Sequence, residues 1–120
     1  MSEDIKAFYD KYKKDMGKLQ GLIPDTIKGF GGSFSAIMKD GALSLKYKEL
    51  IALAIGCALR CEPCINLHVK KCLDVGATKE EILDAASVAV MMQGGPAFTY
   101  LPKVLDALEL CTFGASLGGV

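Results

Sequence analysis

The chain has 120 residues, of which 51% are apolar, and its 14 basic and 14 acidic side chains cancel in charge. This length suits one domain over residues 1–120, and the even charge balance disfavours binding to nucleic acid or to an anionic membrane surface. The longest uncharged apolar run, residues 50–59, is too short to cross a bilayer about 30 Å thick. We therefore expect no membrane span.

The N-terminus and the cysteine content indicate the cellular compartment. The first six residues include charges of both signs and lack the apolar core of a signal peptide. Of the five cysteines, only Cys61 and Cys64 have local disulfide spacing, which disfavours a secreted disulfide scaffold. The sequence therefore predicts a cytoplasmic protein.

The first 41 residues show helical periodicity. One amphipathic helix is predicted from residue 3 to about residue 18. Pro24 suits the first turn of a second helix, which glycines at 29, 31 and 32 weaken and which Asp40 and Gly41 end.

Capping signals mark the helices that follow. Ser44 is a suitable N-cap for a third helix, and Gly76 is suited to end a fourth helix in a left-handed conformation. Thr78 and Glu81 form a capping box for a fifth helix that ends near Gln93.

The last helix is predicted to open at residues 94–96. Pro102 is expected to kink or restart it before residues 104–110, and residues 114–120 are expected to fray. No segment shows the period-2 alternation of a β-strand, so the predicted fold class is all-α, with about six helices.

The most informative motif is Cys61-Glu62-Pro63-Cys64 followed by His68. If a helix starts within residues 62–64, the dipoles of its first turn stabilise thiolate and lower the cysteine pKa below about 8.5. His68 follows Cys64 by four residues, so the imidazole lies within reach of the sulfur and can take or return its proton. Cys64 is thus the better candidate nucleophile, and Cys61 is close enough to form a disulfide with it.

Other interpretations of the motif compete with redox chemistry. Thioredoxin-like pairs follow a buried strand, whereas the Ala- and Leu-rich residues 44–60 favour a helix. Zinc binding would use Cys64, His68 and Cys72, with Cys61 as a fourth ligand. However, positions i and i+8 are about 12 Å apart along a helix axis, so at most three of these side chains could reach one ion.

The remaining cysteines, Cys57, Cys72 and Cys111, lie in apolar or helix-end contexts. Buried free cysteine commonly behaves as a small hydrophobic residue, so we expect all three to serve in packing.

Glu49 extends the motif onto the preceding helix. With Cys61, Cys64 and His68, it resembles the active-site signature of the alkylhydroperoxidase D-like branch of the carboxymuconolactone decarboxylase superfamily. Three further segments are similar to that family: 48–54, 76–82 and 94–97. The resemblance covers about residues 43–109 and implies a small helical bundle with the cysteine pair at the start of a helix. It also implies assembly as a trimer or hexamer.

The resemblance implies a role for each site residue. Cys64 would be the peroxidatic residue that becomes a sulfenic acid, and Cys61 the resolving residue and proton donor. His68 and Glu49 would form the proton relay, with no cofactor and no metal ion. Pro63 departs from the peroxidase prototype, which has histidine at this position, so the substrate is not carried over.

The implied substrate is a small hydroperoxide or a disulfide, and the implied electron donor is a protein thiol or a lipoyl group. Two rival functions are γ-carboxymuconolactone decarboxylase itself and a zinc-bearing oligomeric module without catalytic activity. The decarboxylase branch lacks the paired cysteines, which counts against the first rival. A chain of this size and apolarity should also leave helix faces uncovered, which predicts a homo-oligomer that buries the first or last helix.

The relay poses a geometric problem. In a straight antiparallel hairpin that turns at Cys61, Glu49 lies about 18 Å from the turn and His68 about 10 Å from it. The relay then requires a loop around Arg60, obliquely crossed helices or a bridging water. Gly56 is the place where the third helix is expected to loosen.

Overall fold

The computed structural model of the chain describes residues 2–116, and within this range it contains α-helices and no strands. Six of the helices in this range have 13 or more residues, and the remaining one is a single turn of four residues. The elements are α1 (Ser2–Leu22), α2 (Pro24–Ile37), α3 (Leu45–Ala58), α4 (Glu62–Asp74), α5 (Lys79–Gln93), α6 (Gly95–Phe98) and α7 (Leu101–Ser116). The predicted all-α fold is confirmed.

Side-chain caps begin two of the central helices. The hydroxyl of Ser44 accepts the backbone N–H of Tyr47 at the start of α3. Thr78 and Glu81 make both hydrogen bonds of a capping box at the start of α5. These caps satisfy N–H groups that a helix leaves unpaired at its first turn, which is why the sequence signal located both starts.

The end of α4 also matches its signal. Gly76 has a φ of 90°, which a residue with a side chain rarely adopts. Its N–H donates to the carbonyl of Leu73, and the N–H of Ala77 donates to the carbonyl of Cys72, the pattern of a Schellman cap.

Other helix ends differ from expectation. α1 continues to Leu22 rather than stopping near residue 18, and α2 ends at Ile37, before Asp40. The last helix breaks after Phe98 and restarts with Pro102 in its first turn, as predicted. α7 continues to Ser116, so residues 114–116 are helical rather than frayed, and residues 117–120 lie outside the described part.

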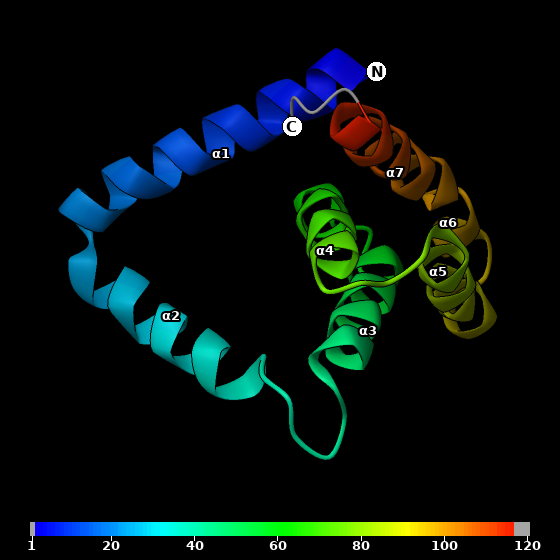
Figure 1. Cartoon of the computed structure of the whole chain (residues 1–120), viewed down its shortest axis with the longest axis horizontal. Helices are drawn as coiled ribbons and strands as arrows, with labels where there is room; N and C mark the ends of the chain where they lie inside the picture. The colour runs from blue at the N-terminus through cyan, green and yellow to red at the C-terminus, as the bar shows by residue number, and fades with distance from the viewer. Residues whose placement is uncertain (1, 117–120) are drawn as a thin grey trace.

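The helices form two parts (Figure 1). We call α3–α7 the body and α1 with α2 the arm. α3 and α4 lie at the centre, where α3 packs against α4 and α5, and α4 packs against α7. The core is made by α3–α7 and includes Leu53, Ile65, Val69, Ile82 and Leu108, each essentially buried. α1 and α2 lie on the side of α3 and α4 that faces away from α5, and α1 also packs against α7.

None of the helices in the described range is long and apolar enough to cross a bilayer.

Candidate functional site

The turn between α3 and α4 brings the motif to the centre of the body. The N–H of Arg60 donates to the carbonyl of Cys57, and that of Cys61 donates to the carbonyl of Gly56. These bonds form a Schellman cap in which Arg60, with a φ of 54°, occupies the position that glycine usually takes. A left-handed non-glycine residue costs about 1–2 kcal/mol. Backbone strain therefore lies directly before the first cysteine of the motif.

The cysteine pair begins α4. Cys61 and Cys64 are joined as a disulfide, with their Cα atoms 5.2 Å apart. Cys61 is the N-cap residue of α4, and its sulfur accepts the backbone N–H of Cys64 over 3.3 Å. Both side chains are half-buried. The helix therefore starts where the redox interpretation required, and its first turn directs a hydrogen bond and the positive end of its dipole at the Cys61 sulfur.

Glu49 and His68 meet directly. Oε1 of Glu49 lies 2.7 Å from Nδ1 of His68, which joins α3 to α4 through side chains alone. Glu49 is only 3% exposed, and the His68 side chain is 19% exposed. A buried carboxylate needs a hydrogen-bond donor to offset the loss of water, and here the imidazole supplies it.

The structure resolves the geometric problem at Gly56. α3 is regular through Gly56, so the expectation that the helix loosens there is wrong. Instead, a Cβ added to Gly56 would lie 3.1 Å from Cβ of Cys64, so the two helices touch at this point. Measured from that contact, Glu49 lies two helical turns away and His68 about one turn away. The difference of about 5 Å along the axes is within the reach of the two side chains.

Burial alters the chemistry of the free cysteines. Cys57 and Cys72 are fully buried, and burial raises the pKa of the Cys57 thiol to about 11. Burial, and then the nearby Glu49 carboxylate, raises the pKa of the Cys72 thiol to about 12. Burial also raises the pKa of Cys111. These thiols stay protonated at neutral pH, as packing groups would, and are poor nucleophiles.

No set of three or more His, Cys, Asp and Glu side chains within the described residues is arranged to hold a metal ion.

Two residues beside the site were not predicted. The Tyr9 hydroxyl on α1 donates to the backbone carbonyl of Asn66, which lies between Cys64 and His68 on α4. The same hydroxyl lies 3.8 Å from the sulfur of Cys111 on α7. Asn66 itself is 3% exposed. Because 57 positions separate Tyr9 from Asn66, no local sequence signal could have paired them.

The sequence matches the model of a known protein family over most of its length. The sequence model of the Carboxymuconolactone decarboxylase family matches residues 24–107, which extend from the start of α2 into the first half of α7 and include all four predicted site residues.

Relatives of similar length support the match. An uncharacterized protein of Cupriavidus necator is 31% identical over 112 residues, covering 91% of this chain and 99% of that protein. An uncharacterized protein of Methanocaldococcus jannaschii is 41% identical over 108 residues, covering 88% and 92%.

Two solved structures share the fold. A carboxymuconolactone decarboxylase family protein from Legionella pneumophila aligns with a TM-score of 0.87 and 34% identity, over 92% of this chain and 98% of that one. A protein of the same family from Thermotoga maritima aligns with a TM-score of 0.83 and 27% identity, over 93% and 96%. Involvement in an antioxidative response has been suggested for the Thermotoga protein.

Proposed function

Because the chain belongs to the carboxymuconolactone decarboxylase family, we propose that it is a thiol-dependent oxidoreductase of the alkylhydroperoxidase D-like type. The observation that carries the proposal is the half-buried disulfide of Cys61 and Cys64 on the same helix as His68, which Glu49 holds. The antioxidative role suggested for the Thermotoga relative agrees with it. The substrate is a hydroperoxide or a partner disulfide.

In the first step Cys64 is the nucleophile. His68 takes the thiol proton, and the resulting thiolate attacks the terminal oxygen of the hydroperoxide. The O–O bond breaks, and Cys64 becomes a sulfenic acid. The departing alkoxide takes the proton from His68 and leaves as an alcohol.

In the second step Cys61 resolves the intermediate. Its sulfur attacks that of Cys64, the S–O bond breaks, and the hydroxide takes the Cys61 thiol proton to leave as water. The hydrogen bond from the Cys64 N–H to the Cys61 sulfur stabilises negative charge on Cys61 as it attacks. The product is the disulfide in the structure.

An external dithiol closes the cycle. It attacks the disulfide, passes through a mixed disulfide and leaves oxidised, returning two electrons to the pair. We propose that this donor is a protein thiol or a lipoyl group.

A peroxidase assay tests the proposal. Wild-type protein supplied with dithiothreitol and cumene hydroperoxide should turn over, and Cys64→Ser should lose at least 100-fold in rate. Cys72→Ser is the matched control, because Cys72 is a buried thiol on the same helix and should retain most of the rate. Equal turnover by wild type and Cys64→Ser would contradict the proposal.

A further inference from the structure

Arg60 connects α3 to the cysteine pair in a backbone conformation that disfavours a side chain. Its φ of 54° lies in the left-handed region, where a glycine would end α3 without a steric cost. Strained residues of this kind cluster at functional sites, where the role of the side chain outweighs the strain. The turn between α3 and α4 therefore keeps a side chain at a position where the fold alone favours none.

The side chain at this position carries a charge that the protein does not neutralise. Arg60 is the single arginine of the chain, and it is exposed. None of the ion pairs and side-chain hydrogen bonds within residues 2–116 includes its guanidinium. Glu62, two positions further along the chain, is paired instead with Lys103 over 3.4 Å. Arg60 therefore offers its positive charge to a group outside the chain.

Arg60 also lies beside the bond that an electron donor must reduce. Consecutive Cα atoms are about 3.8 Å apart, so the arginine is attached directly next to Cys61. The Cys61 side chain is half-buried, and a donor reaches its sulfur past the exposed residues of the turn, which are Leu59, Arg60, Glu62 and Pro63. A guanidinium binds a carboxylate through two parallel N–H···O bonds, which gives a geometric specificity that an ammonium group lacks.

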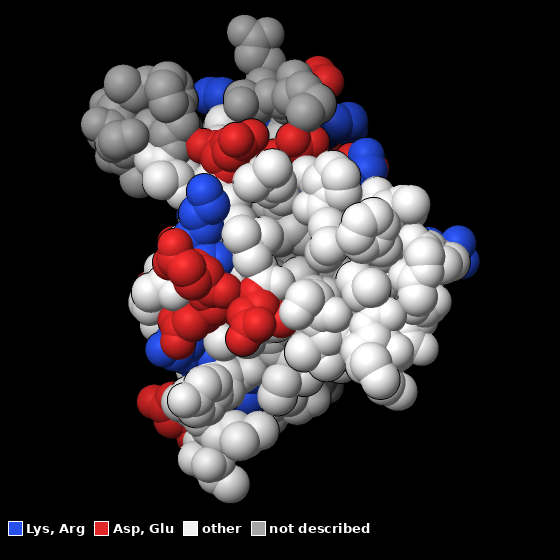
Figure 2. Space-filling view, turned by 90° about the vertical axis from the view of Figure 1, so that its right-hand side faces the viewer, with Lys and Arg blue, Asp and Glu red and all other residues white. Residues whose placement is uncertain are grey.

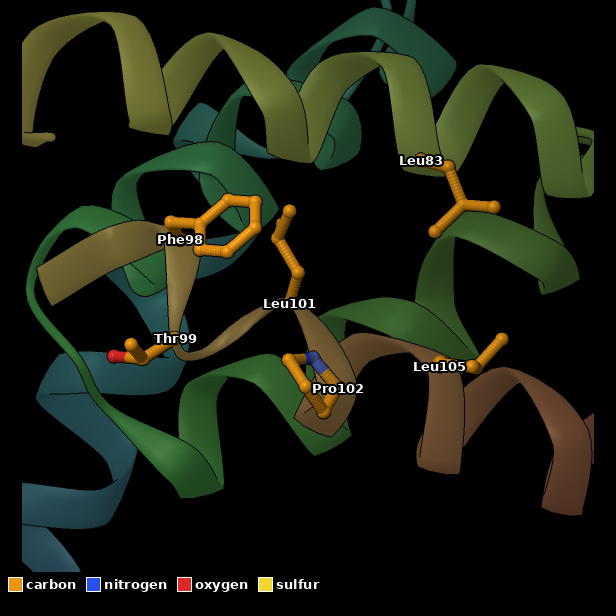
Figure 3. A pocket seen from close by; sticks show the side chains of 6 residues that line it. All are labelled: Leu83, Phe98, Thr99, Leu101, Pro102 and Leu105. Carbon is orange, nitrogen blue, oxygen red and sulfur yellow. The ribbon is translucent and has the colours of Figure 1, made fainter. Parts of the chain in front are cut away.

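A second exposed surface, the hollow between α5 and α7, is less suited to an anionic donor. It is lined by uncharged residues and by neither cysteine of the pair: Leu83, Phe98, Thr99, Leu101, Pro102 and Leu105 (Figure 3). An adjoining hollow at Leu83 is lined by Glu80, Glu81 and Asp84, whose carboxylates repel an anion. Figure 2 shows this side of the molecule as a broad uncharged surface with acidic side chains gathered along one edge. Of the two surfaces, the turn at Arg60 is the one that attracts negative charge.

We propose that Arg60 selects the electron donor by binding a carboxylate of an anionic dithiol, an inference that rests on the proposed function. One donor thiolate attacks the Cys61 sulfur, the S–S bond breaks, and Cys64 leaves as a thiolate one helical turn from His68, which can protonate it. The second donor thiolate then displaces Cys61 from the mixed disulfide. The donor ends as a disulfide, and its two electrons and two protons end on Cys61 and Cys64.

Two donors that differ in one carboxylate test this selection. Dihydrolipoate and dihydrolipoamide present the same dithiol, but only dihydrolipoate carries the negative charge. With saturating cumene hydroperoxide at low salt, Arg60→Gln should lower kcat/KM for dihydrolipoate about 3- to 10-fold, through KM rather than kcat, and leave both constants for dihydrolipoamide unchanged. Arg60→Lys should restore part of the loss. Sodium chloride at about 0.5 M should remove most of the wild-type preference for dihydrolipoate, because salt screens exposed charges.

Lys79→Gln is the matched control and should change the constants for neither donor, because Lys79 is also exposed but follows the opposite end of α4 from the cysteine pair. Equal losses with both donors in Arg60→Gln, no loss with either, or the same loss in Lys79→Gln would overturn the selection by Arg60. A wild type that turns over with neither donor would instead contradict the proposed function itself.

Arg60→Gly separates donor binding from a structural role. It should lower kcat/KM for dihydrolipoate as Arg60→Gln does, yet raise the urea concentration at the unfolding midpoint, because relief of the left-handed strain outweighs the added freedom of the unfolded chain. A lower midpoint would assign the arginine side chain to the stability of the turn and overturn the proposal.

Discussion

Of the two ring nitrogens of His68, Nδ1 lies within hydrogen-bond distance of the Glu49 side chain. Nδ1 lies 2.7 Å from Oε1 of Glu49, and a carboxylate only accepts hydrogen bonds, so a neutral ring paired with it would carry its proton on Nδ1. Nε2 is then the basic nitrogen that can face Cys64 one turn earlier. In the proposed mechanism Glu49 is therefore a positioning residue that acts through the histidine.

This arrangement predicts coupled effects. Glu49→Gln, His68→Gln and the double variant should each slow oxidation of the reduced pair by a similar factor, about 10²–10³, since each removes the same oriented base. Glu80→Gln, which changes a carboxylate on the surface of α5, should leave the rate unchanged. Stopped-flow measurement of thiol oxidation by peroxide checks this. Independent, multiplicative losses would make Glu49 a structural charge rather than a partner of His68.

At the scale of elements, the site depends on how closely α3 and α4 approach. Gly56 has no side chain where α3 meets Cys64, and this lets the two helices touch beside the cysteine pair. The turn through Arg60 holds the same approach from the other end. The spacing of the helices therefore sets the register that joins Glu49 to His68.

Gly56→Ala should disturb this register. The added methyl group would meet Cβ of Cys64, which is fixed to the backbone, so the helices must separate at a cost of about 1–3 kcal/mol in free energy of unfolding. Gly17→Ala is the control, because its added Cβ meets nothing within 4 Å and the exchange should stabilise α1 by up to about 1 kcal/mol. Urea unfolding of both variants measures the difference. A neutral Gly56→Ala would show that the contact is not tight in solution.

The same close packing limits what sequence reasoning could find. The caps of α3 and α5 and the end of α4 were predictable because a few neighbouring residues determine each of them. The contact between Glu49 and His68 was expected from the family resemblance, but the geometry that permits it was not. That geometry depends on Gly56 meeting a residue of another helix, and no periodicity within one helix encodes such a contact. The break before α7 followed from Pro102, whereas the continuation of α7 to Ser116 did not.

For the whole molecule, buried thiols link stability to pH. The folded-state pKa values of Cys57 and Cys72, about 11 and 12, lie above the value of about 8.5 expected for an unfolded chain. Between these values the folded protein binds more protons than the unfolded one. Stability is therefore retained below about pH 8.5 and falls as the pH rises toward 11–12.

Urea unfolding of the oxidised protein should show this loss between pH 8 and pH 10, since Cys61 and Cys64 do not titrate as a disulfide. In the double variant Cys57→Ala, Cys72→Ala, the free energy of unfolding should start lower but decline less steeply with pH. An unchanged slope would assign the alkaline loss to other groups.

In the proposed mechanism Cys64 reacts first with the peroxide, and Cys61 then resolves the sulfenic acid. One structural feature supports this order, because His68 follows Cys64 by one helical turn. Another favours the reverse order, because the hydrogen bond at the start of α4 stabilises negative charge on Cys61. The Cys61→Ser and Cys64→Ser proteins are each treated with one equivalent of peroxide. Dimedone then traps any sulfenic acid, and mass spectrometry locates it, which decides between the two orders. If Cys64 reacts first, a persistent sulfenic acid should form on Cys64 in the Cys61→Ser protein. A stable sulfenic acid found only on Cys61, in the Cys64→Ser protein, would contradict it and reverse the two roles.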